Sequence, residues 1–166
     1  PYSLSDNAIY SLCKDREGGI WIGSYFGGIN YYPRFYTNFE KYYPKGAANG
    51  LQGKRVREFC QDNQGILWIG TEDGGLNRFN PKTKTFSFFT PSNAFTNVHG
   101  LCMVGDNLWV GTFSKGVKVV DTRTGTIVKT YLKTESPHSL VDNSVFSICR
   151  TTTGDIYLGT LFGLLR

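Results

Sequence analysis

The stretch Trp68-Ile69-Gly70-Thr71 decides the fold, because the chain writes this pattern four times. An aromatic residue, an aliphatic residue, a glycine and a hydroxyl residue also follow one another at positions 21–24, 109–112 and 157–160. The aromatic residues at positions 21, 68, 109 and 157 are 47, 41 and 48 residues apart. Periods in this range are typical of solenoids, propellers and repeat arrays. The chain is therefore interpreted as an internal repeat.

The residues around the second copy predict four short antiparallel strands joined by tight turns. Strands are expected over 56–61, 67–71, 76–79 and 85–90. In the first turn, the Asp62 side chain can accept a hydrogen bond from the backbone two residues on, and Gly65 tolerates a positive φ. The first and third copies repeat this order, with the fourth strand of the first copy expected around Phe39. The last copy supplies two strands and the start of a third.

Four strands in each 40 to 50 residues favour a β-propeller blade over other repeats. No stretch has apolar residues at the spacing of an amphipathic helix. The predicted fold class is all-β, a partial β-propeller of about three and a half four-stranded antiparallel blades arranged as an open arc. One partial propeller is expected over 1–166, with blade 1 at 3–51, blade 2 at 52–95, blade 3 at 96–138 and an incomplete blade 4 at 139–166.

The repeated motif has a structural role in this interpretation. Its aromatic residues are expected in the core, stacking neighbouring sheets, and its glycines are expected to leave room for the next blade. The motif residues are Trp21, Gly23, Trp68, Gly70, Trp109, Gly111, Tyr157 and Gly159.

The four cysteines occupy one repeat position and are interpreted as small buried hydrophobic residues. Cys13, Cys60, Cys102 and Cys149 lie 8, 8, 7 and 8 residues before the motif aromatics. Equivalent positions on packed sheets are about 10 Å apart, which is too far for a disulfide. A four-cysteine metal site is the alternative, but the chain has no C-x-x-C pair. The sequence therefore predicts no metal and no cofactor.

Charge and hydropathy exclude some classes of function. The formal net charge is +5, but the basic residues are spread over all repeats, so no nucleic-acid contact is expected. No apolar run approaches the about 18 residues of a membrane span, and no secretion leader is present, so no membrane insertion is expected. Because the chain begins at Pro1, it is expected to be a piece of a longer protein.

The repeat resembles the two-component regulator propeller family, found in the periplasmic sensors of bacterial hybrid two-component systems. The family pattern S-L-x-D-N, D-x-x-G-x-x-W-I-G-T and G-G-L-x-x-[FY] is matched by residues 3–7, 15–24 and 27–32, and again by 62–71 and 74–79. Departures are Tyr157 in place of Trp, Thr151 in place of the turn Asp, Leu164 in place of the second Gly, and a shortened third turn.

The resemblance implies a function for the parent protein. It implies an extracytoplasmic part of an inner-membrane protein that recognises oligosaccharides from polysaccharides and signals to a histidine kinase. The remaining blades of the parent propeller would be partners of this chain. Uncovered blade edges are expected to cause self-association, since exposed strands template pairing.

Two groups of residues are candidates for ligand binding. Loops between the second and third strands share one face with the long connections between blades, and loops on rigid scaffolds commonly carry recognition. These loops carry Tyr25, Phe26, Glu72, Asp73, Phe113, Lys115 and Phe162. The starts of the first strands, expected to line the central channel, carry Arg55, Arg57 and His99, with Tyr10 at the same position in blade 1. For each group, ordinary solvated side chains are the alternative.

Two other classes of function remain open. A protein-interaction propeller is the closer alternative, although the G-H and W-D marks of the WD-repeat proteins are absent. A propeller lyase is the second. No catalytic residues are predicted, because His99 and His138 lie in different repeats and no nucleophile motif accompanies them.

Overall fold

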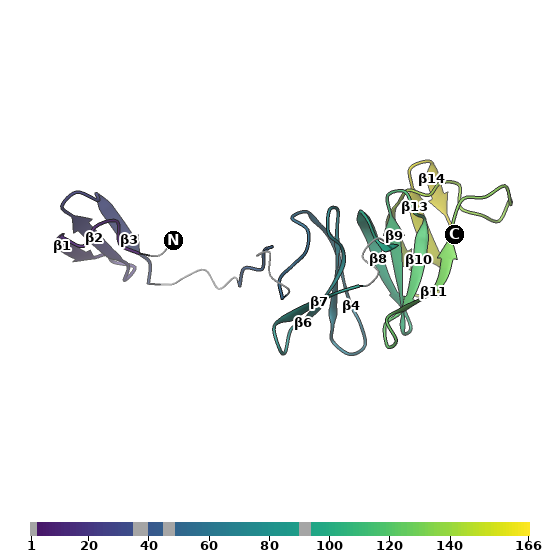
Figure 1. Cartoon of the computed structure of the whole chain (residues 1–166), viewed down its shortest axis with the longest axis horizontal. Helices are drawn as coiled ribbons and strands as arrows, with labels where there is room; N and C mark the ends of the chain where they lie inside the picture. Colours follow the sequence, from purple (N-terminus) through teal and green to yellow (C-terminus); the bar gives the residue numbers. More distant parts are fainter. Residues whose placement is uncertain (1–2, 35–39, 45–48, 90–93) are drawn as a thin grey trace. The chain divides into compact units, whose positions relative to one another are not determined.

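The computed structural model describes residues 3–34, 40–44, 49–89 and 94–166, which form strands joined by turns and loops (Figure 1). The chain divides into two compact units, Pro1–Lys41 (unit 1) and Tyr42–Arg166 (unit 2). Unit 1 holds one antiparallel sheet in the order β1-β2-β3. Its strands are β1 (Ile9–Lys14), β2 (Ile20–Ser24) and β3 (Ile29–Tyr32). The fourth strand predicted around Phe39 lies outside the described residues.

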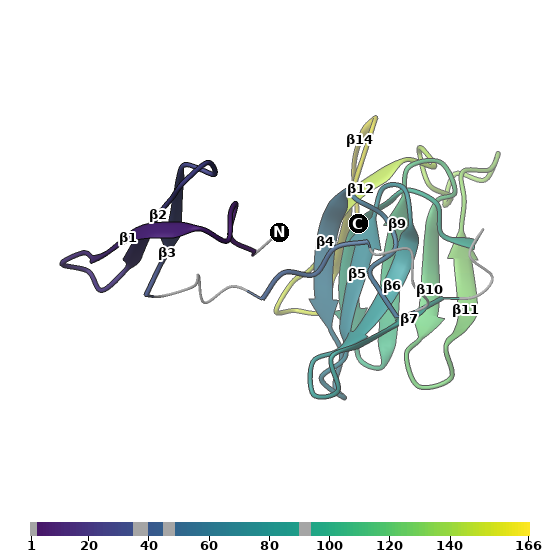
Figure 2. The same cartoon turned by 60° about the vertical axis from the view of Figure 1, so that its left-hand side comes forward.

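Unit 2 holds three antiparallel meanders that stand side by side in Figures 1 and 2. The first consists of β4 (Val56–Gln61), β5 (Leu67–Thr71), β6 (Gly75–Asn80) and β7 (Thr85–Phe88). The second consists of β8 (Val98–Val104), β9 (Asn107–Thr112), β10 (Val117–Asp121) and β11 (Thr126–Tyr131). The third consists of β12 (Val145–Arg150), β13 (Ile156–Thr160) and β14 (Gly163–Leu165).

These meanders confirm the all-β fold class. The first two strands predicted for the second copy coincide with β4 and β5, and the start of a third strand in the last copy is β14. Gly65 has a φ of 80°, and Asp62 Oδ1 accepts from the backbone N–H of Gln64 at 2.9 Å, as the turn pattern predicts. The proposed blade boundaries remain a prediction.

The core of unit 2 lies between its sheets. Trp68 is fully buried in a cluster with Leu76 of its own meander and with β8, β9 and β10 residues such as Val98 and Val110. Complete burial of an indole stabilises a fold by about 4 to 6 kcal/mol before ordering costs. A second cluster around Val117, Val145 and Leu158 joins the last two sheets, with Trp109 packed against it. Each sheet therefore adheres to the next through its motif face.

The motif glycine permits this close approach at two of the four copies. An ideal Cβ on Gly70 would lie 2.5 Å from Val98 Cγ1, and one on Gly111 would lie 3.0 Å from Val145 Cγ1. Val98 and Val145 begin the first strand of the following sheet. At Gly23 and Gly159 the Cβ would instead meet Ser11 and Ser147 of the same sheet.

The turn aspartate holds the motif tryptophan in place. Asp62 Oδ1 accepts from the N–H groups of Gln64 and Ile66, while Oδ2 accepts from Trp68 Nε1 at 2.8 Å. In unit 1, Asp15 Oδ2 accepts from Trp21 Nε1 at 3.0 Å in the same way. The last sheet replaces both partners at once, since Thr151 stands in the turn and Tyr157 on the strand. One carboxylate thus closes a turn and orients a core side chain.

Exposure of Trp21 and of two cysteines corrects the predictions of burial. Trp21 is 44% exposed, because the described residues of unit 1 form one sheet, and its motif face is not covered by another sheet from those residues. Cys13 and Cys149 are also exposed, whereas Cys60 and Cys102 are half-buried. Each cysteine is the cross-strand partner of the motif aromatic, so it lies on the face that the following sheet covers. The sequence places this face correctly but does not show which copies are covered.

Asp62→Asn is expected to destabilise the chain by about 1–3 kcal/mol, because the amide turns a donor toward the buried Trp68 N–H. Urea unfolding followed by fluorescence and circular dichroism measures the loss. In a Trp68→Phe background, which lacks the N–H, the same change should cost much less. Equal costs in the two backgrounds would contradict the assigned role of Asp62.

Gly70→Ala is expected to destabilise the chain by about 1–3 kcal/mol, because the added methyl overlaps Val98. Val98→Ala leaves a cavity in the original chain but removes the overlapping methyl groups in the Gly70→Ala variant, so it should cost less in that background. Thermal unfolding of the two single variants and the double variant measures the coupling. Strictly additive losses would show that Gly70 does not face Val98.

Candidate functional site

The first strand of every sheet contains a β-bulge at the same place. The pairing register shifts between Ile9 and Ser11, Val56 and Glu58, Val98 and Gly100, and Val145 and Ser147. The extra residue in these four bulges is Tyr10, Arg57, His99 and Phe146. A bulge leaves its extra residue outside the ladder and redirects its side chain. The scaffold therefore presents one redirected side chain per sheet.

A repeated backbone hydrogen bond places a turn residue beside each bulge. The residue after the motif hydroxyl donates its N–H to the carbonyl of the residue two positions before the bulge. These bonds are Tyr25 to Ala8 (3.0 Å), Glu72 to Arg55 (2.9 Å), Phe113 to Asn97 (3.0 Å) and Leu161 to Ser144 (3.2 Å). The turn residue and the bulge residue of each sheet consequently lie at the same end of the first two strands.

The motif hydroxyl fixes the shape of this turn. Ser24, Thr71 and Thr112 donate their hydroxyls to the carbonyls of Gly28, Gly75 and Gly116 at 3.0, 3.0 and 2.9 Å. Thr160 does the same to Gly163 at 2.8 Å in a turn that is one residue shorter. The fourth motif position thus supports the loop that carries the candidate residues.

In the first sheet of unit 2 the bulge and turn positions form an ion pair. Arg57 Nη2 donates to Glu72 Oε1 at 2.8 Å, and Arg55 Nη1 lies 3.6 Å from Glu72 Oε2. The Arg55 and Arg57 side chains are 72% and 45% exposed, while that of Glu72 is 23% exposed. The hydrogen bond from Arg57 holds the pKa of Glu72 below its ordinary value. Glu72 is therefore an anion at neutral pH.

In the next two sheets both bulge positions and one of the two turn positions carry aromatic rings, while the other turn residue is Leu161. The His99 ring meets Phe146 edge to face at a centroid distance of 5.2 Å, and Phe113 lies 6.1 Å from both rings. His99 Nε2 is 2.7 Å from Asn97 Oδ1, which orients the imidazole. Phe113 and Phe146 are 45% and 36% exposed. The three rings form a half-exposed aromatic cluster contributed by two adjacent sheets.

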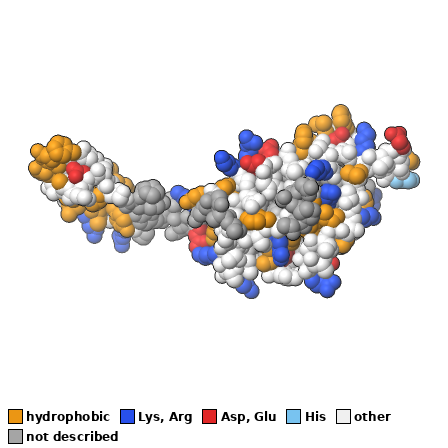
Figure 3. Space-filling model, viewed as in Figure 1, with side chains coloured by type: hydrophobic (Ala, Val, Ile, Leu, Met, Phe, Trp, Pro, Cys, Tyr) orange, Lys and Arg blue, Asp and Glu red, His pale blue; other side chains and the backbone are white. Residues whose placement is uncertain are grey.

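Electrostatics connect the ion pair with the aromatic cluster. Burial and the positive charge of Arg57 lower the pKa of His99 below 6.5, and Glu72 opposes this shift. His99 is consequently a neutral ring at neutral pH. We call the set Arg55, Arg57, Glu72, His99, Phe113 and Phe146 the bulge–turn surface. Figure 3 shows basic and acidic side chains side by side on the upper edge of unit 2.

Asp73 belongs to the framework of the turn. Its Oδ1 accepts from the N–H groups of Lys54 and Arg55 at 2.9 and 3.3 Å, which lowers its pKa. In unit 1 the carboxylate belongs to the segment before the first strand and not to the turn: Asp6 Oδ2 accepts from the N–H of the turn residue Phe26 at 2.9 Å. An ideal Cβ on Gly53, the counterpart of Asp6, would lie 2.8 Å from Asp73 Oδ1. The first repeat thus has its aspartate before the bulge and Phe26 in the turn, whereas the second has Gly53 before the bulge and its aspartate in the turn.

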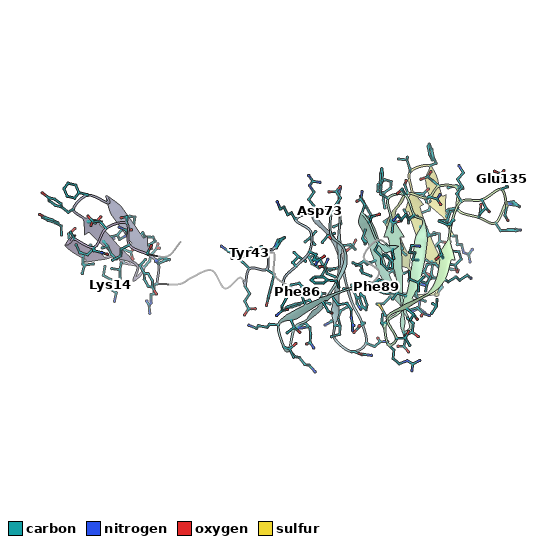
Figure 4. All side chains as sticks on the ribbon, in the orientation of Figure 1. Lys14, Tyr43, Asp73, Phe86, Phe89 and Glu135 are labelled. Atoms are coloured by element: carbon teal, nitrogen blue, oxygen red, sulfur yellow. The ribbon has the colours of Figure 1, made fainter. Side chains whose placement is uncertain are left out.

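The other predicted residues lie around this surface. Asp73 is labelled in Figure 4 at the end of the β5–β6 hairpin, and a hollow of about 280 Å³ beside it is lined by Glu72, Gln52 and Thr96 among others. Lys115 donates its backbone N–H to Thr112 Oγ1, and Phe162 is exposed in the β13–β14 turn.

Unit 1 presents an aromatic version of the same arrangement. Tyr10 stacks on Tyr25 with centroids 4.9 Å apart, and Phe26 meets Tyr25 edge to face at 4.2 Å. All three side chains are exposed, and Figure 3 shows hydrophobic side chains gathered on this unit. Bulge and turn positions are therefore filled by different chemistry in each sheet.

The structure unites the two groups that the sequence suggests separately. Arg55, Arg57 and His99 from the strand starts meet Glu72 and Phe113 from the turns. Phe146 is absent from the predicted residues, although alignment of the four copies would place it with Arg57 and His99. Within the described ranges, no three His, Cys, Asp or Glu side chains are grouped to hold a metal ion.

The packed meanders of unit 2 define the class of the protein, which is a β-propeller segment. Residues 3–26 and 50–73 match the model of the two-component regulator propeller family. These two repeats, which carry the Asp15–Trp21 pair and the Arg55–Glu72 contact, are thus of the two-component regulator type.

The solved structures with the same fold include extracellular domains of two-component systems and a designed protein. The extracellular domain of BT4673 from B. thetaiotaomicron, described as a hybrid two-component system, matches 95% of this chain and 19% of its own, with 24% identity and a TM-score of 0.63. That of BT3049 matches 98% of this chain and 22% of its own, with 27% identity and a TM-score of 0.60. The designed protein Ika4 shares only the fold: it matches 98% of this chain and 93% of its own, with 16% identity and a TM-score of 0.52.

The chain thus spans about a fifth of the natural relatives that it matches. No curated protein matches it. No helix in the described part of the chain has the length and apolar character to cross a membrane.

His99 is expected to titrate below pH 6.5. Arg57→Gln should raise its pKa by removing a repelling charge, and Glu72→Gln should lower it further by removing an attracting one. Proton NMR of the imidazole signals across pH 4–8 measures both shifts, with His138→Gln serving to assign the resonances. Shifts of the opposite sign would contradict the proximity of these three side chains.

Proposed function

We propose that this chain is part of a ligand-sensing propeller in the extracytoplasmic region of a hybrid two-component signalling protein. The two family matches and the likeness to extracellular domains of such systems support this assignment. The parent would be anchored in the inner membrane, with this segment on the periplasmic side. Ligand binding would change how two sensor chains contact each other, and this change would reach a histidine kinase.

We further propose that the ligand is an oligosaccharide released from a polysaccharide, and that the loop face binds it. The single observation that carries this proposal is the repeated bulge–turn pair, which combines a fixed backbone with variable side chains. Exposed aromatic rings next to charged groups suit a sugar, because its C–H face packs on a ring while its hydroxyls form hydrogen bonds. Arg57, Glu72, His99, Phe113 and Phe146 provide this combination on neighbouring strands.

The remaining blades of the parent propeller are proposed partners of unit 1. Exposed apolar side chains on its sheet include Leu12, Ile20, Trp21, Ile29 and Tyr31. Such a surface favours association. We therefore also propose that the isolated chain associates with itself. Contact with nucleic acid and insertion into a membrane are not proposed for this segment.

Isothermal titration calorimetry of the 166-residue chain with defined oligosaccharides tests the proposed function. Phe113→Ala and Phe146→Ala should each weaken binding by about 3- to 10-fold, since each removes one aromatic contact. Val128→Ala is the matched control, because Val128 is an exposed apolar residue on the outer strand β11.

Four results would count against the proposal. Binding of no oligosaccharide by the chain would remove the ligand class, and unchanged affinity in both phenylalanine variants would remove the site. Cleavage of a polysaccharide by the purified chain would instead favour the lyase alternative. If the chain captures a protein partner and no sugar displaces that partner, the result would favour a protein-interaction propeller.

A further inference from the structure

The bulge–turn surface contains more guanidinium donors than carboxylate acceptors. Two arginines share the single carboxylate of Glu72, and one of them approaches it only to 3.6 Å. Each guanidinium carries five N–H donors in a planar fork. Asp73, the next acid along the turn, interacts with Arg55 electrostatically but directs its Oδ1 to backbone N–H groups. The exposed parts of Arg55 and Arg57 are thus available to a second acceptor.

This acceptor would lie beside the aromatic cluster. Arg57 and His99 are the bulge residues of β4 and β8, and these two strands pack against each other, so the guanidinium and the imidazole come from neighbouring strands. His99 contacts Phe113 and Phe146, both of which expose part of their rings. Charge and apolar area therefore adjoin across three successive sheets of unit 2, whose first strands are β4, β8 and β12.

We propose that this surface binds an acidic sugar, specifically a hexuronate unit of an oligosaccharide. Its ring carboxylate would accept paired hydrogen bonds from Arg57 and Arg55, a geometry that suits a planar guanidinium. Its C–H face would pack on Phe113 and Phe146. The inference rests on the proposed function and narrows the ligand class.

The neutrality of His99 contributes to this specificity. A charged imidazole would attract anions of any shape, whereas a neutral ring packed on two phenylalanines offers an apolar edge. Recognition then requires a carboxylate and a sugar ring on one ligand. Simple carboxylates such as acetate should bind at least tenfold more weakly than a hexuronate oligomer.

Calorimetry with a matched ligand pair tests the inference on the 166-residue chain. The pair is trigalacturonate and neutral galactotriose of the same linkage, which differ only in oxidation at C6; a glucuronate and glucose pair is run in parallel. In at least one series the acidic ligand should bind at least tenfold more tightly at low salt. This ratio should fall as salt screens the exposed charges.

Variants separate the carboxylate contact from the rest of the site. Arg57→Gln should weaken the acidic ligand by about tenfold and leave the neutral ligand within twofold, and Arg55→Gln should act in the same direction. Arg123→Gln is the matched control, because Arg123 is an exposed arginine in the β10–β11 turn, at the other end of its meander. Thermal unfolding of each variant shows whether the fold is retained.

The outcomes distinguish the inference from the proposed function. Equal affinity for acidic and neutral ligands in both series, or equal weakening of both by Arg57→Gln, overturns the inference and leaves sugar recognition intact. Binding of neither kind of ligand overturns both.

Discussion

The structure depends on contact between the motif face of one sheet and the first strand of the next. On this face Trp68 fills the space between the sheets, and Gly70 has no side chain, which leaves room for Val98 of the next sheet. Neither residue can stabilise an isolated sheet, because a single meander has nothing against which to bury its own apolar face. Within unit 2 the sheet β8–β11 covers Trp68, whereas the described residues of unit 1 form one sheet, on which Trp21 is exposed although it too is hydrogen-bonded to a turn aspartate.

The same backbone that joins the sheets also carries the candidate site. The bulge and the turn hydrogen bond recur in all four sheets, although the side chains they present range from tyrosine to arginine. A carboxylate supports the turn in both of the first two repeats, although it comes from Asp6 before the bulge in one and from Asp73 in the turn in the other. This separation of framework from variable positions is what allows a repeat protein to acquire a binding surface without altering its core.

The fold could be predicted from the sequence because its signals are local. Strand alternation, turn glycines and the spacing of the motif determine where β4 and β5 begin and end. The burial of each copy could not be predicted, since Cys60 and Cys149 have equivalent local sequences and differ only in the sheet beyond them.

The site could be predicted in part. Turn residues such as Glu72 and Phe113, and strand-start residues such as Arg57, are recognisable as exposed candidates. The turn residues and the strand-start residues come together because the register of the hydrogen-bond ladder shifts at the bulge, and the residue pattern contains no clear signal for this shift. Phe146 is missing from the predicted residues because an aromatic residue in a strand is typical of the core.

The reactivity of the cysteines tests the stacking of the sheets most directly. Timed labelling of the folded chain at low concentration with a thiol reagent, resolved by peptide mass spectrometry, gives a rate for each site. Cys149 should react fastest within unit 2, whereas burial beneath the next sheet raises the pKa of Cys60 and Cys102 and should slow both by at least tenfold. Equal rates at Cys60, Cys102 and Cys149 would contradict the stacking of the three sheets.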